Sequence, residues 1–127
     1  MPWLSQLDAT GIVKKSWELG KEPVVFGRDD DVQVQIDDHQ MSRRHFEVKL
    51  VGDSHVLHDL NSTNGTWHNG SRVIHAYLKA NDRIQAGNTF FTYQVGTSTF
   101  LGILEHAAGT TIRDELKDIY KAAKKKG

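Results

Sequence analysis

Short runs in which apolar and polar residues alternate, separated by turn dipeptides, set the main limit on how this chain can fold. In the run 32–36, Val32, Val34 and Ile36 alternate with two glutamines, and the run 46–50 alternates in the same way. A period of two places every second side chain on one face of a strand. Each run therefore predicts a half-buried β-strand.

Further segments have the composition of strands, with β-branched and aromatic residues in short runs. They span residues 13–19, 23–26, 56–60 and 88–95. Turn dipeptides lie between the runs: Gly20-Lys21, Gly52-Asp53, Asn64-Gly65, Asn69-Gly70, Asn81-Asp82 and Gly87-Asn88. Asn69-Gly70 is typical of a type I′ hairpin turn, in which both central residues have positive φ. Short strands at roughly ten-residue spacing predict an all-β sandwich or barrel.

Composition narrows the class of protein. The chain has 127 residues, enough for one domain with its own core, and no cysteine, which excludes disulfides and thiolate zinc sites. Basic and acidic residues number 16 each, which argues against a protein that coats nucleic acid or a membrane surface. Neither a spanning apolar run nor a secretory signal is present. We therefore expect an intracellular, cytoplasmic protein; a nuclear location stays open for a eukaryotic one.

The end of the chain differs from the rest. Residues 1–97 hold 10 basic and 12 acidic residues, whereas residues 98–127 hold six basic and four acidic ones. Apolar residues recur at helical spacing in this last part, which predicts an α-helix at about 111–124, outside the sandwich. We expect a domain over 1–97 followed by an extension over 98–127.

Three clusters rich in hydrogen-bond donors lie at the ends of predicted strands. Gly27-Arg28 follows one strand, Ser-Arg-Arg-His at 42–45 precedes another, and Asn-Ser-Thr-Asn-Gly-Thr at 61–66 lies before Asn69-Gly70. Arginine guanidinium groups and hydroxyls are the donors that a phosphate dianion needs. The clusters contain no obvious general base.

The order and spacing of these clusters resemble the forkhead-associated (FHA) family of phosphothreonine-peptide binding modules. The matching segments are FGR at 26–28, DVQVQI at 31–36, SRRH at 42–45, DLNSTNGTWHNG at 59–70 and NDRIQAG at 81–87. The resemblance covers roughly residues 11–96. It implies a β-sandwich of eleven short strands that binds through loops at one end, without catalysis or a cofactor. The implied partner is a phosphothreonine-containing protein or peptide in a serine/threonine kinase pathway.

The resemblance also implies roles for single residues. Arg28 and Ser42 match phosphate ligands, and Arg43 occupies a position where a polar or basic residue often reaches the phosphate. Thr63 matches the residue that borders the phosphate and the threonine methyl. Asn64 matches the residue that forms a hydrogen bond with the peptide main chain. His45 resembles a brace between the loops. The loop-shaping residues are Gly27, Gly65, Thr66 and Asn69. Gln40 lies at a variable position where the third residue after the phosphothreonine is often recognised.

The same residues also have plainer interpretations. Arg28 could pair with one of the aspartates at 29–31, which would leave no phosphate ligand there. Ser42, His45 and Asp59 could suggest a hydrolase triad, but the nucleophile motif G-x-S-x-G is missing. The nearest histidine pairs are His55/His58 and His68/His75. Neither pair has a cysteine or carboxylate at zinc spacing, so we expect no metal site.

Two other functions stay open at this point. One is a scaffold that recruits partners independently of phosphate, through the faces of the sandwich or the C-terminal helix. The other is weak nucleic-acid binding by the segment 121–127, which carries four lysines. The neutral balance of charge over the whole chain makes nucleic acid the less favoured partner.

Overall fold

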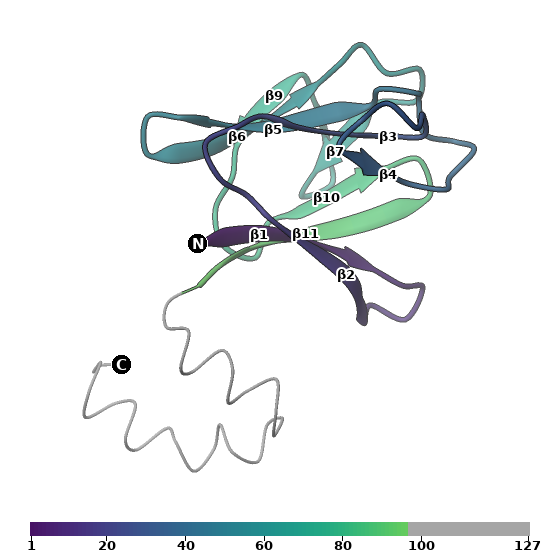
Figure 1. Cartoon of the computed structure of the whole chain (residues 1–127). Helices are drawn as coiled ribbons and strands as arrows, with labels where there is room; N and C mark the ends of the chain where they lie inside the picture. Colours follow the sequence, from purple (N-terminus) through teal and green to yellow (C-terminus); the bar gives the residue numbers. More distant parts are fainter. Residues whose placement is uncertain (97–127) are drawn as a thin grey trace. The chain divides into compact units, whose positions relative to one another are not determined.

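Two layers of short, mostly antiparallel strands form the part of the chain that the structure describes. The structure is a computed structural model, and it describes residues 1–96. Figure 1 shows the two layers facing each other, with one end of the sandwich built from long loops. The all-β sandwich predicted from the sequence is confirmed, with eleven strands within the described residues. The predicted helix at about 111–124 lies outside them.

One layer has six strands in the order β2-β1-β11-β10-β7-β8. Its central strand β11 pairs with β1 from Pro2↔Val95 to Leu7↔Phe90. The strands are β1 (Pro2–Leu7), β2 (Val13–Glu18), β7 (Thr66–His68), β8 (Ser71–Val73), β10 (Arg83–Ala86) and β11 (Thr89–Val95). The alternation found in sequence gives no sign of β1, which inserts between β2 and β11.

The other layer has five strands in the order β4-β3-β5-β6-β9. All of its pairs are antiparallel except β3 with β4. The strands are β3 (Val24–Gly27), β4 (Val34–Gln35), β5 (Phe46–Val51), β6 (Ser54–Asp59) and β9 (His75–Tyr77). The run predicted at 32–36 alternates in burial as expected, although only Val34 and Gln35 belong to strand β4.

The core lies between the layers and is centred on three phenylalanines. Phe26 and Phe46 stack with their ring centroids 4.7 Å apart, and Phe91 of the other layer meets both rings edge-on. All three side chains are fully buried. Phe26 and Phe46 are neighbours on β3 and β5, close to where these strands meet the loop end. The aromatic core therefore fixes the strands from which the site loops start.

The predicted hairpin at Asn69-Gly70 joins β7 to β8. Asn69 has φ of 50° and Gly70 has φ of 88°, the left-handed values that a type I′ turn requires at both positions. The segment 13–19, which the sequence predicts to be a strand, is only partly buried. Trp17 and Leu19 face the core, whereas Val13 lies beyond a register shift in the pairing of β1 with β2, opposite Leu7, and is exposed.

The end of the sandwich opposite the long loops holds a pocket of about 510 Å³, which residues of both layers line. His55 and Tyr93 close its inner side: the Tyr93 hydroxyl donates to His55 Nδ1 over 3.2 Å, and His55 Nε2 donates to the Gly20 carbonyl over 3.0 Å. Burial, helped by the charge of Asp82, raises the pKa of Tyr93. Within residues 1–96 no helix is long and apolar enough to cross a membrane.

Candidate functional site

The predicted site residues lie in loops that meet at one end of the sandwich. Phe26 pairs with Phe46, and Phe46 pairs with Asp59, so β3, β5 and β6 are aligned there. The loop after β3, the loop before β5 and the loop after β6 therefore start side by side. They occupy the right-hand end of the view in Figure 1.

Gly27 lets the loop after β3 approach the loop before β5 at backbone distance. A Cβ atom on Gly27 would lie 2.0 Å from the carbonyl oxygen of Arg43. The contact continues as two backbone hydrogen bonds, from Arg28 N to Ser42 O at 3.0 Å and from Asp29 N to Arg43 O at 3.1 Å. Glycine is needed here because any side chain would separate the two loops.

The Arg28 guanidinium is exposed but held in place. Its Nε donates to the carbonyl of Met41 over 3.0 Å, which leaves the two terminal nitrogens available. Within residues 1–96 the structure records no ion pair between Arg28 and the aspartates at 29–31. The nearby cation that does pair is Arg44, 3.8 Å from Asp31. A partly oriented guanidinium without a carboxylate partner is suited to an external anion.

His45 joins two of the loops from inside. Its side chain is fully buried, and its Nδ1 accepts a hydrogen bond from Ser42 N over 3.0 Å. A nitrogen that accepts from an N–H carries no proton, so Nε2 holds it and donates to the Gly65 carbonyl over 2.8 Å. Both ring nitrogens are thus occupied, which leaves the imidazole neither free to act as a base nor free to contact a ligand.

Ser42 links the loop before β5 to the loop after β6. Its Oγ accepts a hydrogen bond from Thr63 N over 2.9 Å, so its own proton is left to donate elsewhere. Ser42 is half-buried, and Thr63 and Arg43 are exposed beside it. Hydroxyl and guanidinium donors therefore gather on the outer surface of the joined loops.

Asn64 is tied to the same neighbouring loop. Its Nδ2 donates to the Gln40 carbonyl over 2.9 Å and approaches Gln40 Oε1 at 3.3 Å. The amide oxygen of Asn64 stays available as an acceptor for a main-chain N–H. Gln40 and Asn64 lie 24 residues apart in the sequence, and the fold brings them into contact.

Asp59 organises the loop after β6. From the sequence alone, this residue stands out only as a possible member of a hydrolase triad. Its carboxylate accepts hydrogen bonds from the backbone and hydroxyl of Ser62 and, over 2.6 Å, from the buried Thr66 hydroxyl. Burial acts to raise the pKa of Asp59, but the bonds from Ser62 and Thr66 outweigh it and lower the pKa. Ser62 in turn accepts from Gly65 N, which shapes the turn that presents Thr63 and Asn64.

Asp38 joins the loop before β5 to the other layer. It is buried, and it accepts hydrogen bonds from Gln40 N at 2.9 Å, from Asn88 N at 2.7 Å and from the Thr89 hydroxyl at 2.6 Å. Burial opposes ionisation, but these bonds lower the pKa of Asp38 overall. Nothing in the sequence marks this carboxylate as structural, because its partners lie up to 51 residues away.

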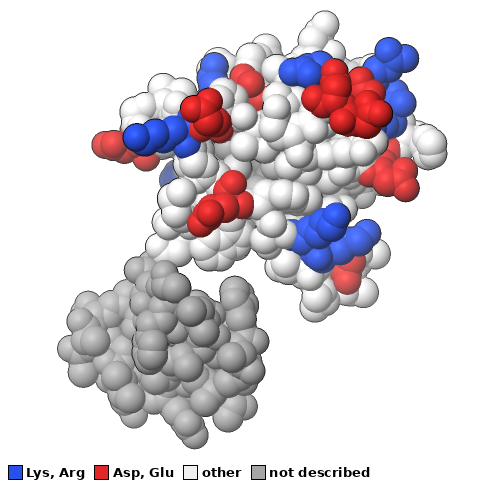
Figure 2. Space-filling view, in the orientation of Figure 1, with Lys and Arg blue, Asp and Glu red and all other residues white. Residues whose placement is uncertain are grey.

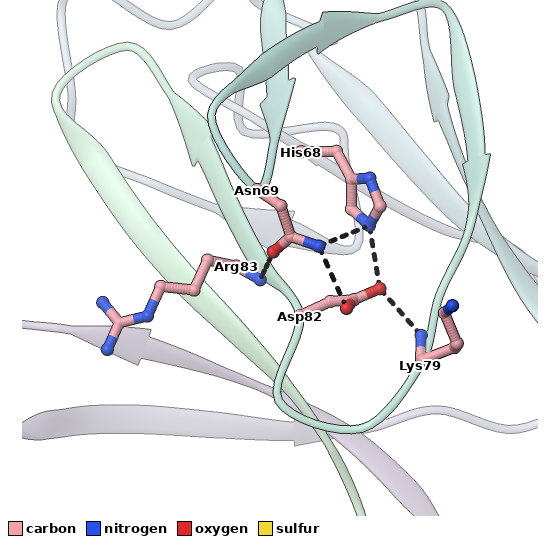
Figure 3. A network of polar contacts seen from close by, with 5 residues as sticks. All are labelled: His68, Asn69, Lys79, Asp82 and Arg83. Atoms are coloured by element: carbon pink, nitrogen blue, oxygen red, sulfur yellow. Dashed lines mark hydrogen bonds and ion pairs between the residues drawn. The ribbon is translucent and has the colours of Figure 1, made fainter.

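Asn69 anchors its hairpin to β10 (Figure 3). Its Oδ1 accepts from Arg83 N over 2.8 Å, and its Nδ2 donates to Asp82 over 3.1 Å. Asp82, which is buried, also accepts from His68 Nε2 and from Lys79 N, each over 2.8 Å. Burial acts against ionisation, yet the bonds from His68 and Lys79 lower the pKa of Asp82. Asn69 therefore acts through the hairpin and lies outside the donor cluster.

Charges of both signs surround the loop end. At the right-hand side of Figure 2, basic and acidic side chains lie next to one another, with no broad field of one sign. The described residues contain no group of three or more side chains arranged to hold a metal ion. Selectivity for an anion must therefore come from local donors more than from the overall potential.

We predict that His45→Ala lowers stability and ligand binding together. The substitution leaves Ser42 N and the Gly65 carbonyl without their buried partner, and each lost bond of this kind costs about 1 to 3 kcal/mol. A thermal melt of the variant, followed by a ligand titration at a temperature where it is folded, checks both effects. An unchanged melting temperature would contradict the bracing role.

We also predict that the domain loses stability in acid through Asp38, Asp59 and Asp82. Their folded-state pKa values lie below the ordinary value of 3.8, so each contributes stability above pH 4. That contribution disappears as the pH falls through the lowered folded pKa. Thermal melts between pH 6 and pH 2.5 should show this decline, and Asp59→Asn should make it shallower. A slope identical in the variant would exclude Asp59 as a contributor.

The chain matches known proteins over this same region. The family profile of the FHA domain matches residues 24–87. Curated relatives include the FHA domain-containing protein FhaA of Mycobacterium tuberculosis, 36% identical over 75 residues, which are 59% of this chain and 14% of FhaA. The glycogen accumulation regulator GarA of Mycolicibacterium smegmatis is 36% identical over 70 residues, 55% of this chain and 44% of GarA. The chain thus spans less than half the length of either relative.

Solved structures match nearly the whole described part. One, from work on phosphothreonine-dependent FHA domain interactions, has a TM-score of 0.69 and 31% identity; the match covers 76% of this chain and 98% of that one. Another is the FhaA FHA domain complexed with the intracellular domain of Rv3910, with a TM-score of 0.67 and 32% identity, covering 74% of this chain and all of that one. Both likenesses include the loop end described above.

Proposed function

Because this chain belongs to the FHA domain family, we propose that it binds a phosphothreonine-containing segment of a partner protein through the loop end. The observation that carries the proposal is the joined set of loops, in which Arg28 and Ser42 present free donors on a braced frame. We propose that the protein acts as an adaptor or sensor in serine/threonine kinase signalling, inside the cell and in the cytoplasm.

Each part of a phosphothreonine has a counterpart at the loop end. Arg28 and the Ser42 hydroxyl supply charge-assisted hydrogen bonds to the phosphate, and Arg43 adds a second exposed cation beside them. Thr63 borders the phosphate and the threonine methyl, and the amide oxygen of Asn64 accepts from the peptide main chain. The loops are already bonded to one another, so little ordering is required of the protein when the peptide binds.

Phosphothreonine suits these donors better than the alternatives. A phosphate carries about −1.5 to −2 charges at neutral pH and three strong acceptor oxygens, whereas aspartate has less charge and a flat carboxylate. The threonine methyl adds about 0.8 kcal/mol when it is fully buried, and it restricts χ1 before binding. We therefore expect phosphoserine to bind more weakly than phosphothreonine.

The protein binds without catalysis in this proposal. His45 uses both ring nitrogens within the frame, and the groups proposed to contact the peptide, Arg28, Ser42, Arg43, Thr63 and Asn64, include no carboxylate or imidazole that could act as a general base. The proposed binding domain covers residues 1–97, and residues 98–127 form a separate extension. No cofactor is required, because recognition needs only charge, hydrogen bonds and shape.

A specific observation supports phosphate-independent scaffolding as a second candidate. The outer face of the six-stranded sheet carries exposed apolar side chains on either side of Leu7, with Val13 54% and Phe90 43% exposed, and Ile12, in the turn before β2, is 63% exposed. Apolar side chains gathered on one face favour a protein contact. This surface does not require a phosphate, and it leaves the loop donors unused.

Titration separates the two candidates. A phosphothreonine peptide library, with each sequence also made unphosphorylated, is applied to the purified protein, and affinities are measured by calorimetry or fluorescence anisotropy. Phosphate-dependent binding in the micromolar range supports the proposed function. Equal affinity for the phosphorylated and plain forms, lost on Phe90→Ser, would instead support scaffolding through the outer face.

A further inference from the structure

Arg72 of β8 lies against the loop that carries the proposed peptide contacts. A Cβ atom placed on Gly65 would be 2.5 Å from Arg72 Nε and 2.8 Å from its Cζ, so the guanidinium covers the Gly65 backbone. Gly65 directly follows Thr63-Asn64 in the chain. Arg72 pairs with Trp67 on β7, which holds it at the edge of the sheet next to that loop.

The guanidinium of Arg72 is available for a ligand. Arg72 is exposed, and within residues 1–96 its side chain makes neither an ion pair nor a hydrogen bond. It therefore differs from Arg44, which pairs with Asp31, and from Arg28, whose Nε is bonded to Met41. An arginine whose guanidinium lies against a backbone, with its nitrogens unpaired, is well prepared to bind an anionic group.

Arg72 and Gln40 flank the same loop from opposite sides. Strand β7, which begins just after Gly65, lies between β10 and β8 in the sheet. Arg72 lies on the β8 side, whereas the loop of Gln40 is bonded through Asp38 to the turn between β10 and β11. A peptide gripped at Asn64 therefore has one flank near a neutral amide and the other near a cation.

We propose that Arg72 selects peptides with an anionic side chain, a carboxylate or a second phosphate, on the flank opposite the one that meets Gln40. This inference rests on the proposed function and adds a specificity residue to it. Arginine binds carboxylate and phosphate alike through paired N–H donors. The aspartates at 29–31 disfavour acidic peptides as a class, so an acidic residue should be tolerated chiefly where Arg72 can reach it.

Position-scanned phosphopeptides test the inference. One phosphothreonine peptide that binds is remade with Glu, Gln or phosphoserine at each of the three positions on either side, and each peptide is titrated against the wild type and Arg72→Gln. Exposed ion pairs contribute up to about 1 kcal/mol, so we expect roughly fivefold tighter binding for Glu than for Gln at one position. Arg72→Gln should remove that preference, and Arg72→Lys should retain part of it.

Arg83→Gln is the matched control, because Arg83 is also an exposed arginine of the same sheet. Figure 3 shows its side chain extending away from the Asn69 and Asp82 network. The control should keep the Glu preference, and thermal melts should show all three variants folded. A stronger gain with phosphoserine than with Glu would identify a second phosphate as the favoured group.

The outcomes separate this inference from the proposed function. Phosphate-dependent binding with no preference for Glu or phosphoserine at any position overturns the role of Arg72 and leaves the proposed function standing. A preference that survives Arg72→Gln, or that is lost equally in Arg83→Gln, overturns it too. If the wild type does not distinguish phosphorylated from plain peptides, both the proposed function and the inference fall.

Discussion

Arg28→Ala is expected to weaken phosphopeptide binding at least 30-fold while the domain stays folded. Removing one partner of a close charge pair costs about 2 to 5 kcal/mol, and the lower figure already corresponds to roughly 30-fold in affinity. The side chain is exposed and, among residues 1–96, makes one hydrogen bond, to the Met41 carbonyl, so its loss should affect stability little. Titration of a binding peptide measures the first effect and a thermal melt the second.

Two further variants sharpen this test. Arg28→Lys keeps the charge but loses the planar guanidinium and its bond to Met41, so it should bind with intermediate affinity. Arg44→Ala removes a neighbouring exposed arginine that pairs with Asp31, and it should leave the affinity within about twofold of the wild type. Affinity of Arg28→Ala within threefold of the wild type would remove Arg28 from the site.

Gly27→Ala is expected to lower stability by about 3 kcal/mol and to weaken binding as well. The new Cβ would lie 2.0 Å from the Arg43 carbonyl oxygen and 2.7 Å from its carbon. Both atoms belong to the backbone, so no side-chain rotation relieves the clash. Overpacking of this kind typically costs about 1 to 3 kcal/mol, and a backbone clash belongs at the upper end of that range. For a domain of this size we expect the melting temperature to fall by roughly 10 to 20 °C.

The binding defect of Gly27→Ala has a separate cause. Separating the two loops breaks the bonds from Arg28 N to Ser42 O and from Asp29 N to Arg43 O, which displaces the proposed phosphate donors. Gly20→Ala is the matched control, since a Cβ there would meet only the Met1 Cε atom, at 4.0 Å. If Gly27→Ala has the same melting temperature as the Gly20→Ala control and binds the peptide with normal affinity, Gly27 is not required for the close approach of the two loops.

The sequence predicted the fold class because most strands have one buried face. Alternation at 32–36 and 46–50 indicates which side chains face the core, and Asn69-Gly70 indicates a turn with two positive φ values. Strand β1 escaped prediction because its apolar residues face both ways: Leu4 faces the core, and Leu7 lies on the outer face against Phe90 and Val13. A strand that is covered on both faces loses the period of two.

The candidate site was only partly visible in the sequence. Arg28, Ser42 and Asn64 stand out as donors in ordered loops, so a motif can point to them. The carboxylates of Asp38 and Asp82 look like ordinary surface charges in the sequence. Their burial follows from partners that only the fold supplies, such as Thr89 for Asp38 and His68 for Asp82. Arg72 likewise gains its place from strand pairing and from its contact with Gly65.

The pairing of Pro2 with Val95 makes the sandwich suitable for splicing into another protein. These two residues face each other across neighbouring strands. Figure 1 shows the start of the chain at the end of the sandwich away from the long loops. A host protein could accept the segment from Pro2 to Val95 in an exposed surface loop, since the two junctions lie only one strand spacing apart. In such a chimaera the proposed phosphate donors would lie at the end of the domain away from the host, which is the arrangement that a genetically encoded reporter of threonine phosphorylation requires.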